Sequence, residues 1–380
     1  MLKILKKRNL LFDGFRMMSD CKTLVANSEE SSKTYPKRIF SGIQPTGNVH
    51  LGNYLGVIRD WVRMQDAKED VLLSIVDLHA ISLPQDPKEL RKNIYNLMAT
   101  LLACGIDHEK TILFQQSGVL AHTGLCWVLG CFTTMPRLAH LPQFKEKSQK
   151  VKDVPLGIYI YPVLQAADIL LYRATHVPVG QDQVQHLQLA QQLAQVFNTR
   201  YGETFPIPHS VINNNNFRIR SLRDPSKKMS KSSNDPKGVL SLIDEPKVIV
   251  NKLKKAITDF TSQVTYNPQE RPGVANLILL HSALSGKTPD EICYEARDLD
   301  TGKYKLVLAA EVVDRLRPIR ERIMELTNEP QYLDDVLKKG TERAIEIAEE
   351  CWLDVKKKIG FNSDNVTSYG NQVRKEANRS

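Results

Sequence analysis

The chain has 380 residues, of which 42% are apolar and 25% charged, so it can bury a core large enough for roughly two domains of ~150 residues. No apolar run approaches the ~20 residues that a membrane-spanning helix needs, which excludes an integral membrane protein. Of the formal charge of +9, residues 1–38 supply +5, so the remaining body is only mildly basic. Six cysteines without a C-x-x-C pair indicate buried, reduced thiols rather than a zinc site.

Residues 1–38 differ in composition from the rest of the chain. The first acidic residue is Asp13, so a helix at the start would be basic and amphipathic, as in mitochondrial transit segments. We therefore expect the protein in the mitochondrial matrix, and a plain disordered extension is the alternative. A second start at Met17 or Met18 would remove most of this segment and give a cytoplasmic form. The polar stretch 28–38 predicts a linker into the folded part.

Short apolar runs alternate with helical patterns from residue 38 onwards. Strands are predicted at residues 38–43, 71–77, 111–115 and 176–179. Helices are predicted at residues 50–65, 87–104, 122–133, 161–172 and 182–199. This alternation is typical of an α/β fold with a parallel sheet and crossover helices.

Strand patterns fade after about residue 233. Helical spacing with charged outer faces predicts helices at residues 246–257, 274–284, 304–326 and 341–359. We therefore expect an α/β domain over residues 39–233 and a C-terminal helical domain over residues 234–361. The tail, residues 362–380, is polar and has no periodicity, and we expect it to be disordered.

A glycine-bearing turn follows the first predicted strand. Residues 45–47, Pro-Thr-Gly, break the strand, and His50 opens a helix. A strand, a glycine turn and a helix N-terminus in this order place backbone N–H groups where a phosphate can bind. Gly52 would let a nucleotide approach the backbone, and His50 and Asn53 share a helix face. The alternative is a tight turn in which His50 caps the helix.

A lysine-rich segment over residues 224–233 has neither a helical nor a strand pattern. Lys227, Lys228 and Lys231 stand there among small hydroxyl residues. On a loop that can close, such lysines neutralise the charge of a leaving pyrophosphate. A solvated basic loop would explain the charges alone, but their occurrence together with the glycine turn favours nucleotide chemistry.

These motifs together resemble the class I aminoacyl-tRNA synthetases, and in particular the tryptophanyl-tRNA synthetase family of the bacterial and mitochondrial type. The matching segments occur in the family's order at residues 41–47, 50–56, 161–168, 177–183 and 228–232. The resemblance spans about residues 38–361. It implies a Rossmann-like catalytic domain, an anticodon-binding helical domain and a homodimer. It also implies ATP with Mg²⁺, L-tryptophan and tRNA(Trp) as ligands.

One predicted helix carries a polar stripe, because Tyr161, Gln165 and Asp168 are four and three residues apart. Pro162 suits a first helical position, which would place Tyr161 at the helix start. Asp168 lies among apolar residues, where an unpartnered carboxylate would be costly and a donor-only indole N–H would suit it. By the resemblance, Asp168 reads the indole. Gln165, where the bacterial family has Met, is either a further polar contact or a satisfied core group.

The resemblance assigns roles residue by residue. The tryptophan pocket would comprise Phe40, Gly42, His79, Tyr161, Gln165, Asp168, Val177, Val179 and Gln183. ATP would contact Gln44, Pro45, Thr46, Gly52, Asn53, Lys147, Gly180, Gln181, Asp182, Ile219, Lys228, Met229, Ser230, Lys231 and Ser232. Catalysis would rest on Gln44, His50, Asn53, Lys228 and Lys231. These groups would position ATP and stabilise charge while the tryptophan carboxylate attacks the α-phosphate.

Other interpretations remain open at this point. A tyrosine-activating enzyme would share the turn, the loop and the Tyr, Gln and Asp stripe. A nucleotidylyltransferase would lack the full lysine loop and the helical tail. A catalytically silent RNA-binding paralogue would not need Asp168, Lys228 and Lys231.

Two further groups have competing explanations. Asp182 and His186 are four residues apart but have no third ligand at a suitable spacing, so we predict no metal site and a structural hydrogen bond for His186. Arg315, Arg317 and Arg320 would contact the anticodon by the resemblance, although a solvated helix face explains their charges equally well.

Overall fold

The computed structural model of the protein describes residues 34–141, 153–180, 183–211, 219–230 and 235–361. The targeting segment predicted over residues 1–38 lies almost entirely outside these residues, and so does the tail from residue 362. Within the described ranges, no helix combines the length and the apolar character that crossing a membrane requires.

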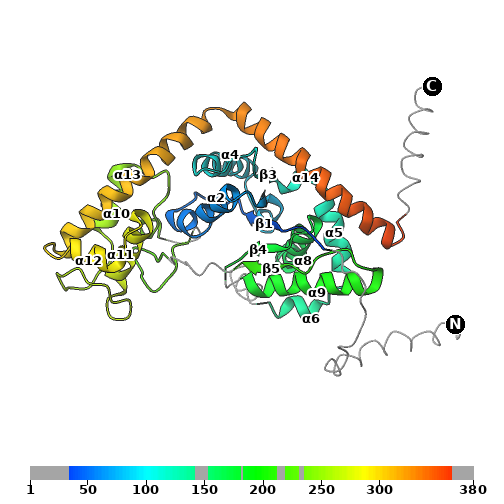
Figure 1. The fold of residues 1–380 in the computed structure, drawn as a ribbon, viewed down its shortest axis with the longest axis horizontal. Coiled ribbons are helices and arrows are strands. Elements are labelled where there is room, and N and C mark those ends of the chain that lie inside the picture. Colours follow the sequence, from blue (N-terminus) through cyan, green and yellow to red (C-terminus); the bar gives the residue numbers. More distant parts are fainter. Residues whose placement is uncertain (1–33, 142–152, 181–182, 212–218, 231–234, 362–380) are drawn as a thin grey trace. The chain divides into compact units, whose positions relative to one another are not determined.

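Five parallel strands form one sheet (Figure 1). They are β1 (Arg38–Ile43), β2 (Asp70–Ile75), β3 (Ile112–Gln115), β4 (His176–Pro178) and β5 (His209–Val211). Their order is β3-β2-β1-β4-β5, so the winding direction reverses between β1 and β4, which are paired at Ile39 and His176. The predicted parallel α/β sheet is confirmed. The short strand β5 is not predicted by the sequence pattern, because it has no apolar run.

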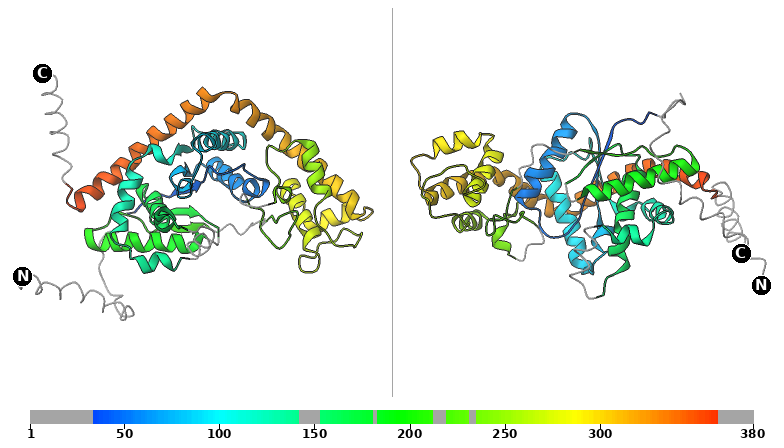
Figure 2. Two further views of the ribbon diagram at one scale, coloured as in Figure 1. Left: turned by 180° about the vertical axis from the view of Figure 1, so that it is seen from behind. Right: turned by 90° about the horizontal axis from the view of Figure 1, so that it is seen from below.

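Helices cover both faces of the sheet (Figures 1 and 2). The longer ones before residue 212 are α2 (Arg59–Asp66), α4 (Pro87–Ala103), α5 (Ala121–Gly130), α8 (Leu156–Leu171) and α9 (Val184–Tyr201), and the short ones are α1 (Leu51–Asn53), α3 (Asp77–Ala80) and α6 (Met135–Ala139). Neighbours along a strand face opposite ways, so Ile39 and Leu73 pack with α2 and α4. Phe40 and Leu72 pack with α5, α8 and α9. The sheet therefore lies between two apolar cores.

Two helices before residue 212 differ from their predicted form, and the helix predicted at residues 341–359 begins eleven residues earlier, at Pro330. The helix predicted at residues 50–65 is divided into α1, a π-helical stretch at Tyr54–Ile58 and α2. Helix α8 begins at Leu156, so the prediction that Pro162 opens the helix was wrong. A proline inside a helix removes one backbone hydrogen bond. Here the burial of Ile158 and Tyr161, 0% and 6% exposed, stabilises the additional turn.

Residues 235–361 are mostly helical. The helices are α10 (Pro246–Lys254), α11 (Pro272–Ser285), α12 (Pro289–Glu295), α13 (Thr301–Thr327) and α14 (Pro330–Lys358). Helix α14 crosses β3 so closely that a Cβ on Gly340 would lie 1.8 Å from the carbonyl oxygen of Leu113. Ala344 and Ala348 join the same core as α5 and α8. Helix α14 thus packs on the sheet, although it belongs to the predicted helical domain. The division into two domains at residue 233 therefore stays a prediction.

Candidate active site

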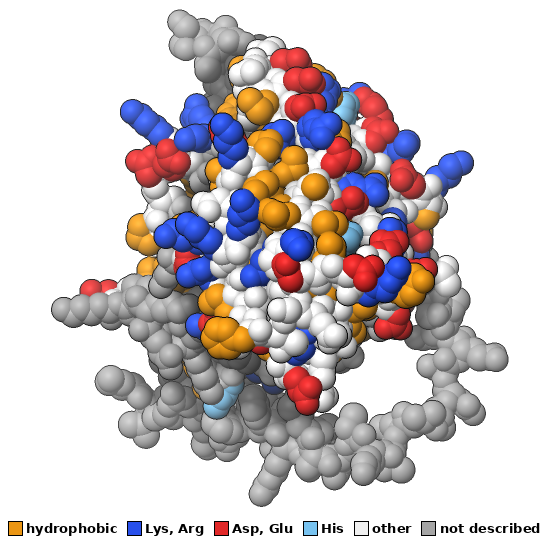
Figure 3. Space-filling model, turned by 90° about the vertical axis from the view of Figure 1, so that its left-hand side faces the viewer, with side chains coloured by type: hydrophobic (Ala, Val, Ile, Leu, Met, Phe, Trp, Pro, Cys, Tyr) orange, Lys and Arg blue, Asp and Glu red, His pale blue; other side chains and the backbone are white. Residues whose placement is uncertain are grey.

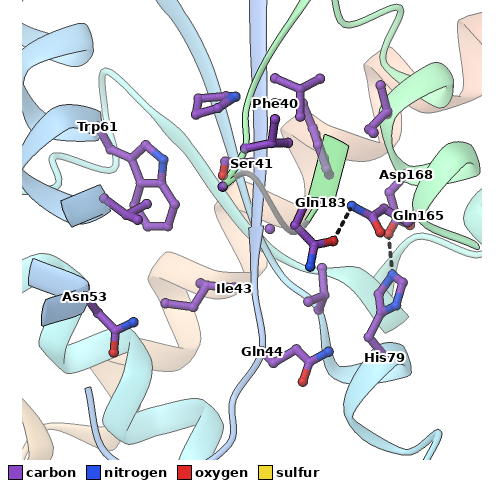
Figure 4. Close-up of a pocket in the computed structure, with 18 of the residues that line it drawn as sticks. Phe40, Ser41, Ile43, Gln44, Asn53, Trp61, His79, Gln165, Asp168 and Gln183 are labelled. Carbon is purple, nitrogen blue, oxygen red and sulfur yellow. Dashed lines mark hydrogen bonds and ion pairs between the residues drawn. The ribbon is translucent and has the colours of Figure 1, made fainter. Parts of the chain in front are cut away.

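A cavity of about 330 Å³ lies at the carboxyl ends of β1 and β4 (Figure 4). The strand order reverses between these two strands, and open α/β sheets bind their ligands at such points. All the residues predicted to hold tryptophan line it, namely Phe40, Gly42, His79, Tyr161, Gln165, Asp168, Val177, Val179 and Gln183. The predicted nucleotide contacts Gln44, Asn53 and Gly180 line it too. In Figure 4, Asn53 and Trp61 lie on one side of β1, and Asp168 and Gln183 lie on the other.

Asp168 is only 1% exposed, and both of its carboxylate oxygens have partners. Oδ1 accepts hydrogen bonds from Gln116 Nε2 and His122 Nδ1, each at 2.7 Å. Oδ2 lies 2.7 Å from His79 Nε2. Three side chains from other elements thus offset the cost of burying this carboxylate.

The side chains around Asp168 are themselves oriented by hydrogen bonds. Gln116 Oε1 accepts from the backbone N–H of Leu78 at 3.1 Å, so the amide nitrogen faces Asp168. His122 Nε2 lies 2.8 Å from the hydroxyl of Tyr172, whose pKa is raised by burial and further by the charge of Asp168. That hydroxyl therefore keeps its proton and donates it to Nε2. The proton of His122 is left on Nδ1, facing Asp168.

The charge of Asp168 follows from these contacts. Burial acts to raise the pKa of Asp168, but the charge of His79 and the hydrogen bonds from His122 and His79 act against it, and the pKa is lowered. The ionised carboxylate can only accept hydrogen bonds. Of its about four lone-pair positions, two are occupied on Oδ1 and one on Oδ2. The remaining position belongs to Oδ2, and both Asp168 and His79 line the cavity.

Asp77 fixes the short helix α3, which carries His79. Asp77 Oδ1 accepts from the backbone N–H groups of Leu78 at 3.1 Å and Ser117 at 3.0 Å. Asp77 Oδ2 accepts from Gln115 Nε2 at 2.7 Å and from Ser117 Oγ at 2.5 Å. Because Gln115 and Ser117 lie at the end of β3, these bonds tie α3 to the sheet. They set the position of His79 relative to the buried carboxylate.

A second hydrogen-bond network runs through the wall formed by α8 and α9. His186, 1% exposed, has its Nε2 3.2 Å from the Tyr161 hydroxyl and its Nδ1 2.9 Å from Gln183 Oε1. Gln165 Nε2 donates to the same oxygen at 3.4 Å (Figure 4). The structural hydrogen bond predicted for His186 is confirmed, while Asp182 lies outside the described residues. Gln165 thus lines the cavity and has a polar partner in its wall.

The glycine turn lies beside the lysine loop. His50 caps α1, because its Nδ1 accepts from the backbone N–H of Asn53 at 3.2 Å and its own N–H donates to Asn53 Oδ1 at 3.3 Å. A Cβ on Gly52 would lie 3.1 Å from the His50 ring and 3.7 Å from Met229 Cβ. Two motifs that are far apart in the sequence are therefore neighbours, and Lys228 next to Met229 is exposed.

The other predicted nucleotide contacts do not line the cavity or cannot be placed. Ile219 and Met229 are core residues, 2% and 1% exposed, joined by a hydrogen bond from Met229 N–H to Ile219 O at 3.1 Å. Pro45 is buried, and Thr46 and Ser230 are half-buried. Outside the described residues lie Lys147, Gln181, Asp182, Lys231 and Ser232. Their roles stay predictions.

Sequence reasoning missed three members of the buried network: Gln116, His122 and Tyr172. Gln116 directly follows β3, and polar side chains at the carboxyl ends of parallel strands are a usable signal for a site. His122 gives only the weaker signal of a polar ring in an apolar helix. Tyr172 gives none, because a tyrosine at the end of a buried helix is most often a core residue.

The chain matches the family described as tRNA synthetases class I (W and Y) over residues 32–317. It is 46% identical to the tryptophan–tRNA ligase of Wolinella succinogenes, over 86% of this chain and 99% of the relative. It is 44% identical to the mitochondrial tryptophan–tRNA ligase of Caenorhabditis elegans, over 87% of this chain and 93% of the relative.

Two solved structures are similar to the fold. The tryptophanyl-tRNA synthetase of Mycoplasma pneumoniae has a TM-score of 0.76 and 31% identity, covering 87% of this chain and 100% of that chain. The tryptophanyl-tRNA synthetase of Campylobacter jejuni, solved with ADP and tryptophan, has a TM-score of 0.75 and 30% identity, covering 85% of this chain and 99% of that chain.

Proposed function

We propose an assignment of roles from one premise: this chain belongs to the class I tRNA synthetases for tryptophan and tyrosine, and it is a tryptophan–tRNA ligase. It uses ATP to convert L-tryptophan to tryptophanyl-adenylate, releases pyrophosphate and transfers the amino acid to tRNA(Trp). The residues of the site divide between two tasks. Some select the amino acid, and others stabilise the negative charge on the leaving pyrophosphate.

Asp168 selects tryptophan. The observation that carries this role is the one acceptor position left on Asp168 Oδ2, beside His79 at the wall of the cavity. An indole N–H only donates, so it completes the hydrogen bonds of the carboxylate. Phenylalanine has no donor and would leave a buried, charged oxygen unsatisfied, which a site penalises strongly.

The remaining residues of the wall hold the ring and the amino end. Phe40, Val177 and Val179 offer the apolar surface for the indole, and Gly42 lets Val76 pack close to β1, because a Cβ there would lie 2.9 Å from a methyl of Val76. Tyr161 and Gln183 hold the amino end of the substrate. Their shared contact with His186 keeps both in place.

The glycine turn and the lysine loop act on ATP. The tryptophan carboxylate attacks the α-phosphorus in line, the bond to the bridging oxygen breaks and pyrophosphate leaves, so no protein nucleophile is required. Gln44, Asn53 and the N–H groups at the start of α1 position the phosphates. Lys228 and Lys231 neutralise the leaving pyrophosphate. The nearness of the loop to the turn supports this role, since a Cβ added at Gly52 would lie 3.7 Å from Met229 Cβ.

Mg²⁺ fits this site as a partner of ATP rather than of the protein. The described residues contain no cluster of three or more His, Cys, Asp or Glu that could hold a metal ion. Mg²⁺ keeps several waters and commonly binds through substrate phosphates. When bound, it would supply additional neutralisation of the triphosphate, and the lysines would supply the rest.

The macromolecular partners are tRNA(Trp) and a second copy of the chain. A second copy is supported by an exposed apolar face comprising Ile81, Trp127, Met135 and Leu156, 56%, 76%, 68% and 68% exposed, which we call the apolar face. The arginines predicted to contact the anticodon are already engaged. Arg315 pairs with Glu311, Arg317 pairs with Asp314, and Arg320 donates to the carbonyl of Asp244. These contacts favour the alternative, a solvated helix face.

The protein works in the mitochondrial matrix in this proposal. The basic, amphipathic composition of residues 1–38 supports it, as does the 44% identity to a relative named as mitochondrial. Imaging the protein in cells with and without residues 1–38 tests its localisation. Mitochondrial localisation without these residues would contradict their role, and a cytoplasmic form would be expected to start at Met17 or Met18.

Pyrophosphate exchange tests the choice of amino acid. The purified protein should exchange labelled pyrophosphate into ATP with tryptophan, and far more slowly with tyrosine or phenylalanine at equal concentration. Exchange with tyrosine alone would overturn the assignment. A protein that charges no tRNA and exchanges with neither amino acid would support the silent paralogue instead.

A further inference from the structure

Phe260 stands out in the segment between α10 and α11. Phe260 is fully exposed, with a relative exposure of 108%. Val264 in the same segment is only 4% exposed. Single exposed apolar residues are common and need no explanation by themselves. The unusual feature is how firmly the backbone beneath this ring is held.

Arg271 anchors the chain on both sides of Phe260. The guanidinium, in a residue only 9% exposed, donates to the two carboxylate oxygens of Asp259 at 3.0 and 2.9 Å. It also donates to the carbonyl of Thr261 at 3.0 Å and to that of Gln263 at 2.7 Å. The residues before and after Phe260 are thereby bonded to one buried group, and the charge of Asp259 is neutralised.

Helix α13 provides a second set of anchors. Lys305 Nζ donates to the carbonyl of Ala256 at 2.8 Å and to Thr258 Oγ1 at 2.9 Å. The N–H of Thr301 donates to the carbonyl of Ser262 at 2.8 Å. The backbone from residue 256 to residue 262 is therefore fixed at both ends and in the middle, and it presents the Phe260 side chain to solvent.

The residues that flank Phe260 in the chain are polar, and the acidic neighbour Asp259 is paired with Arg271. Thr261, Ser262 and Gln263 are exposed, so the ring is not part of an apolar groove that would suit a protein partner. Lys254 and Lys255 end helix α10 just before the anchored segment, and neither forms an ion pair with any residue that the structure describes. Figure 3 looks onto the side where Figure 1 draws α10, α11 and α12, and apolar side chains lie there among charged side chains of both signs.

We propose that Phe260 is a stacking platform for an unpaired base of the tRNA, and that Lys254 and Lys255 contact the adjoining phosphates. An exposed aromatic ring together with cations a few residues away in the chain is the chemistry that binds single-stranded nucleic acid. A backbone already held in place loses little conformational entropy on binding. This inference rests on the tRNA charging described above and gives that reaction a contact outside the cavity.

The test compares Phe260→Ala, Phe260→Leu and Phe260→Tyr in the full chain. Phe260→Ala should raise KM for tRNA in aminoacylation about 5- to 150-fold, which corresponds to stacking of about 1–3 kcal/mol. Phe260→Tyr should keep the KM for tRNA of the unsubstituted protein. Phe260→Leu should raise it as Phe260→Ala does, because a leucine has no π-face. Pyrophosphate exchange with tryptophan does not involve tRNA and should be unchanged in all three variants.

A control and a salt titration sharpen the test. Tyr294→Ala should leave KM for tRNA unchanged, because Tyr294 is 69% exposed but its ring lies 4.4 Å from the guanidinium of Arg297. Lys254→Ala with Lys255→Ala should reduce the slope of log KM against log salt by about 1.4, at ~0.7 per phosphate contact on a single strand.

Three outcomes would overturn the platform. An unchanged KM for tRNA in Phe260→Ala is the first, and full activity of Phe260→Leu is the second. The third is a change in oligomeric state of Phe260→Ala without a change in KM for tRNA, which would point to a protein partner. A chain that fails in pyrophosphate exchange before any substitution would instead contradict the proposed function itself.

Discussion

At the scale of the residue, Asp168 combines burial with a retained negative charge. Its pKa is lowered in the fold, so the stability that it contributes is present above its unfolded pKa of about 3.9 and is lost as the pH falls through its folded pKa. The charge also keeps the carboxylate a pure acceptor at the pH of catalysis. In the proposed role of Asp168, selection and stability thus depend on the same group.

Asp168→Asn separates these effects from packing, because the two side chains have nearly the same shape. The NH₂ group of the asparagine would face other donors instead of accepting from them. We therefore expect KM for tryptophan to rise about 10- to 150-fold, since a hydrogen bond to a charged group contributes about 1.5–3 kcal/mol. In urea unfolding, the stability difference from the unsubstituted protein should shrink as the pH falls below about 4. An unchanged KM in Asp168→Asn would refute the selection role.

His122 is a positioning residue, because it touches the carboxylate and not the substrate. His122→Asn retains an N–H near the place of Nδ1, and His122→Leu does not. Both should lose about 1–3 kcal/mol of stability, since the buried Tyr172 hydroxyl loses its partner. Only His122→Leu should raise KM for tryptophan, with kcat affected less. Equal KM values for the two variants would show that His122 is merely structural.

At the scale of the element, the crossing of α14 over β3 joins the C-terminal helix to the sheet. Gly340 makes this crossing possible, because any side chain there would meet the backbone of Leu113. A helix can accept a glycine at a cost of about 1 kcal/mol, and the close approach offsets that cost. The contact places α14 against the same core that carries Asp168.

Gly340→Ala should therefore destabilise the protein by about 3 kcal/mol or more, because backbone cannot give way as a side chain can. Gly56→Ala is the matched control, since nothing lies within 4 Å of its added Cβ. That variant should be neutral or slightly more stable. Urea unfolding measures both. Equal stabilities of the two variants would mean that α14 does not cross β3 at this distance.

At the scale of the whole molecule, the apolar face adjoins the active site. A cavity of about 640 Å³ opens on this face, and Tyr161 lines both this cavity and the tryptophan cavity. A second copy seated on the apolar face would therefore contact α8, the helix that carries Tyr161 and Asp168. Dimer formation and tryptophan binding should be coupled.

Trp127→Glu tests this coupling by placing a charge in the centre of the apolar face. We expect the unsubstituted protein to sediment as a dimer and the variant as a monomer with a raised KM for tryptophan, because burying an unpaired charge is costly. Phe260→Ala should remain a dimer. If the unsubstituted protein is a monomer at micromolar concentration, the apolar face has another occupant.

The sequence by itself determined the parallel sheet, the two nucleotide motifs and the stripe of Tyr161, Gln165 and Asp168. These features depend on local periodicity and on glycine and proline positions, which a single stretch of chain carries. The structure brings the whole predicted tryptophan set to one cavity. For most of that set, the family resemblance supplied the assignment, because no local pattern links residues 40, 79 and 177.

Only the tertiary structure decided which groups hold Asp168 and which of its oxygens keeps an acceptor position. Gln116 and His122 reach Asp168 from 52 and 46 residues away, through the joint packing of three elements. The same holds for the close approach of Gly340 in α14 to Leu113 in β3, because the two residues are 227 positions apart in the sequence. Helical and strand periods describe which face a side chain occupies. They do not specify which side chain of another element lies opposite that face. Those opposite side chains set the charge of Asp168 and leave one of its acceptor positions unoccupied.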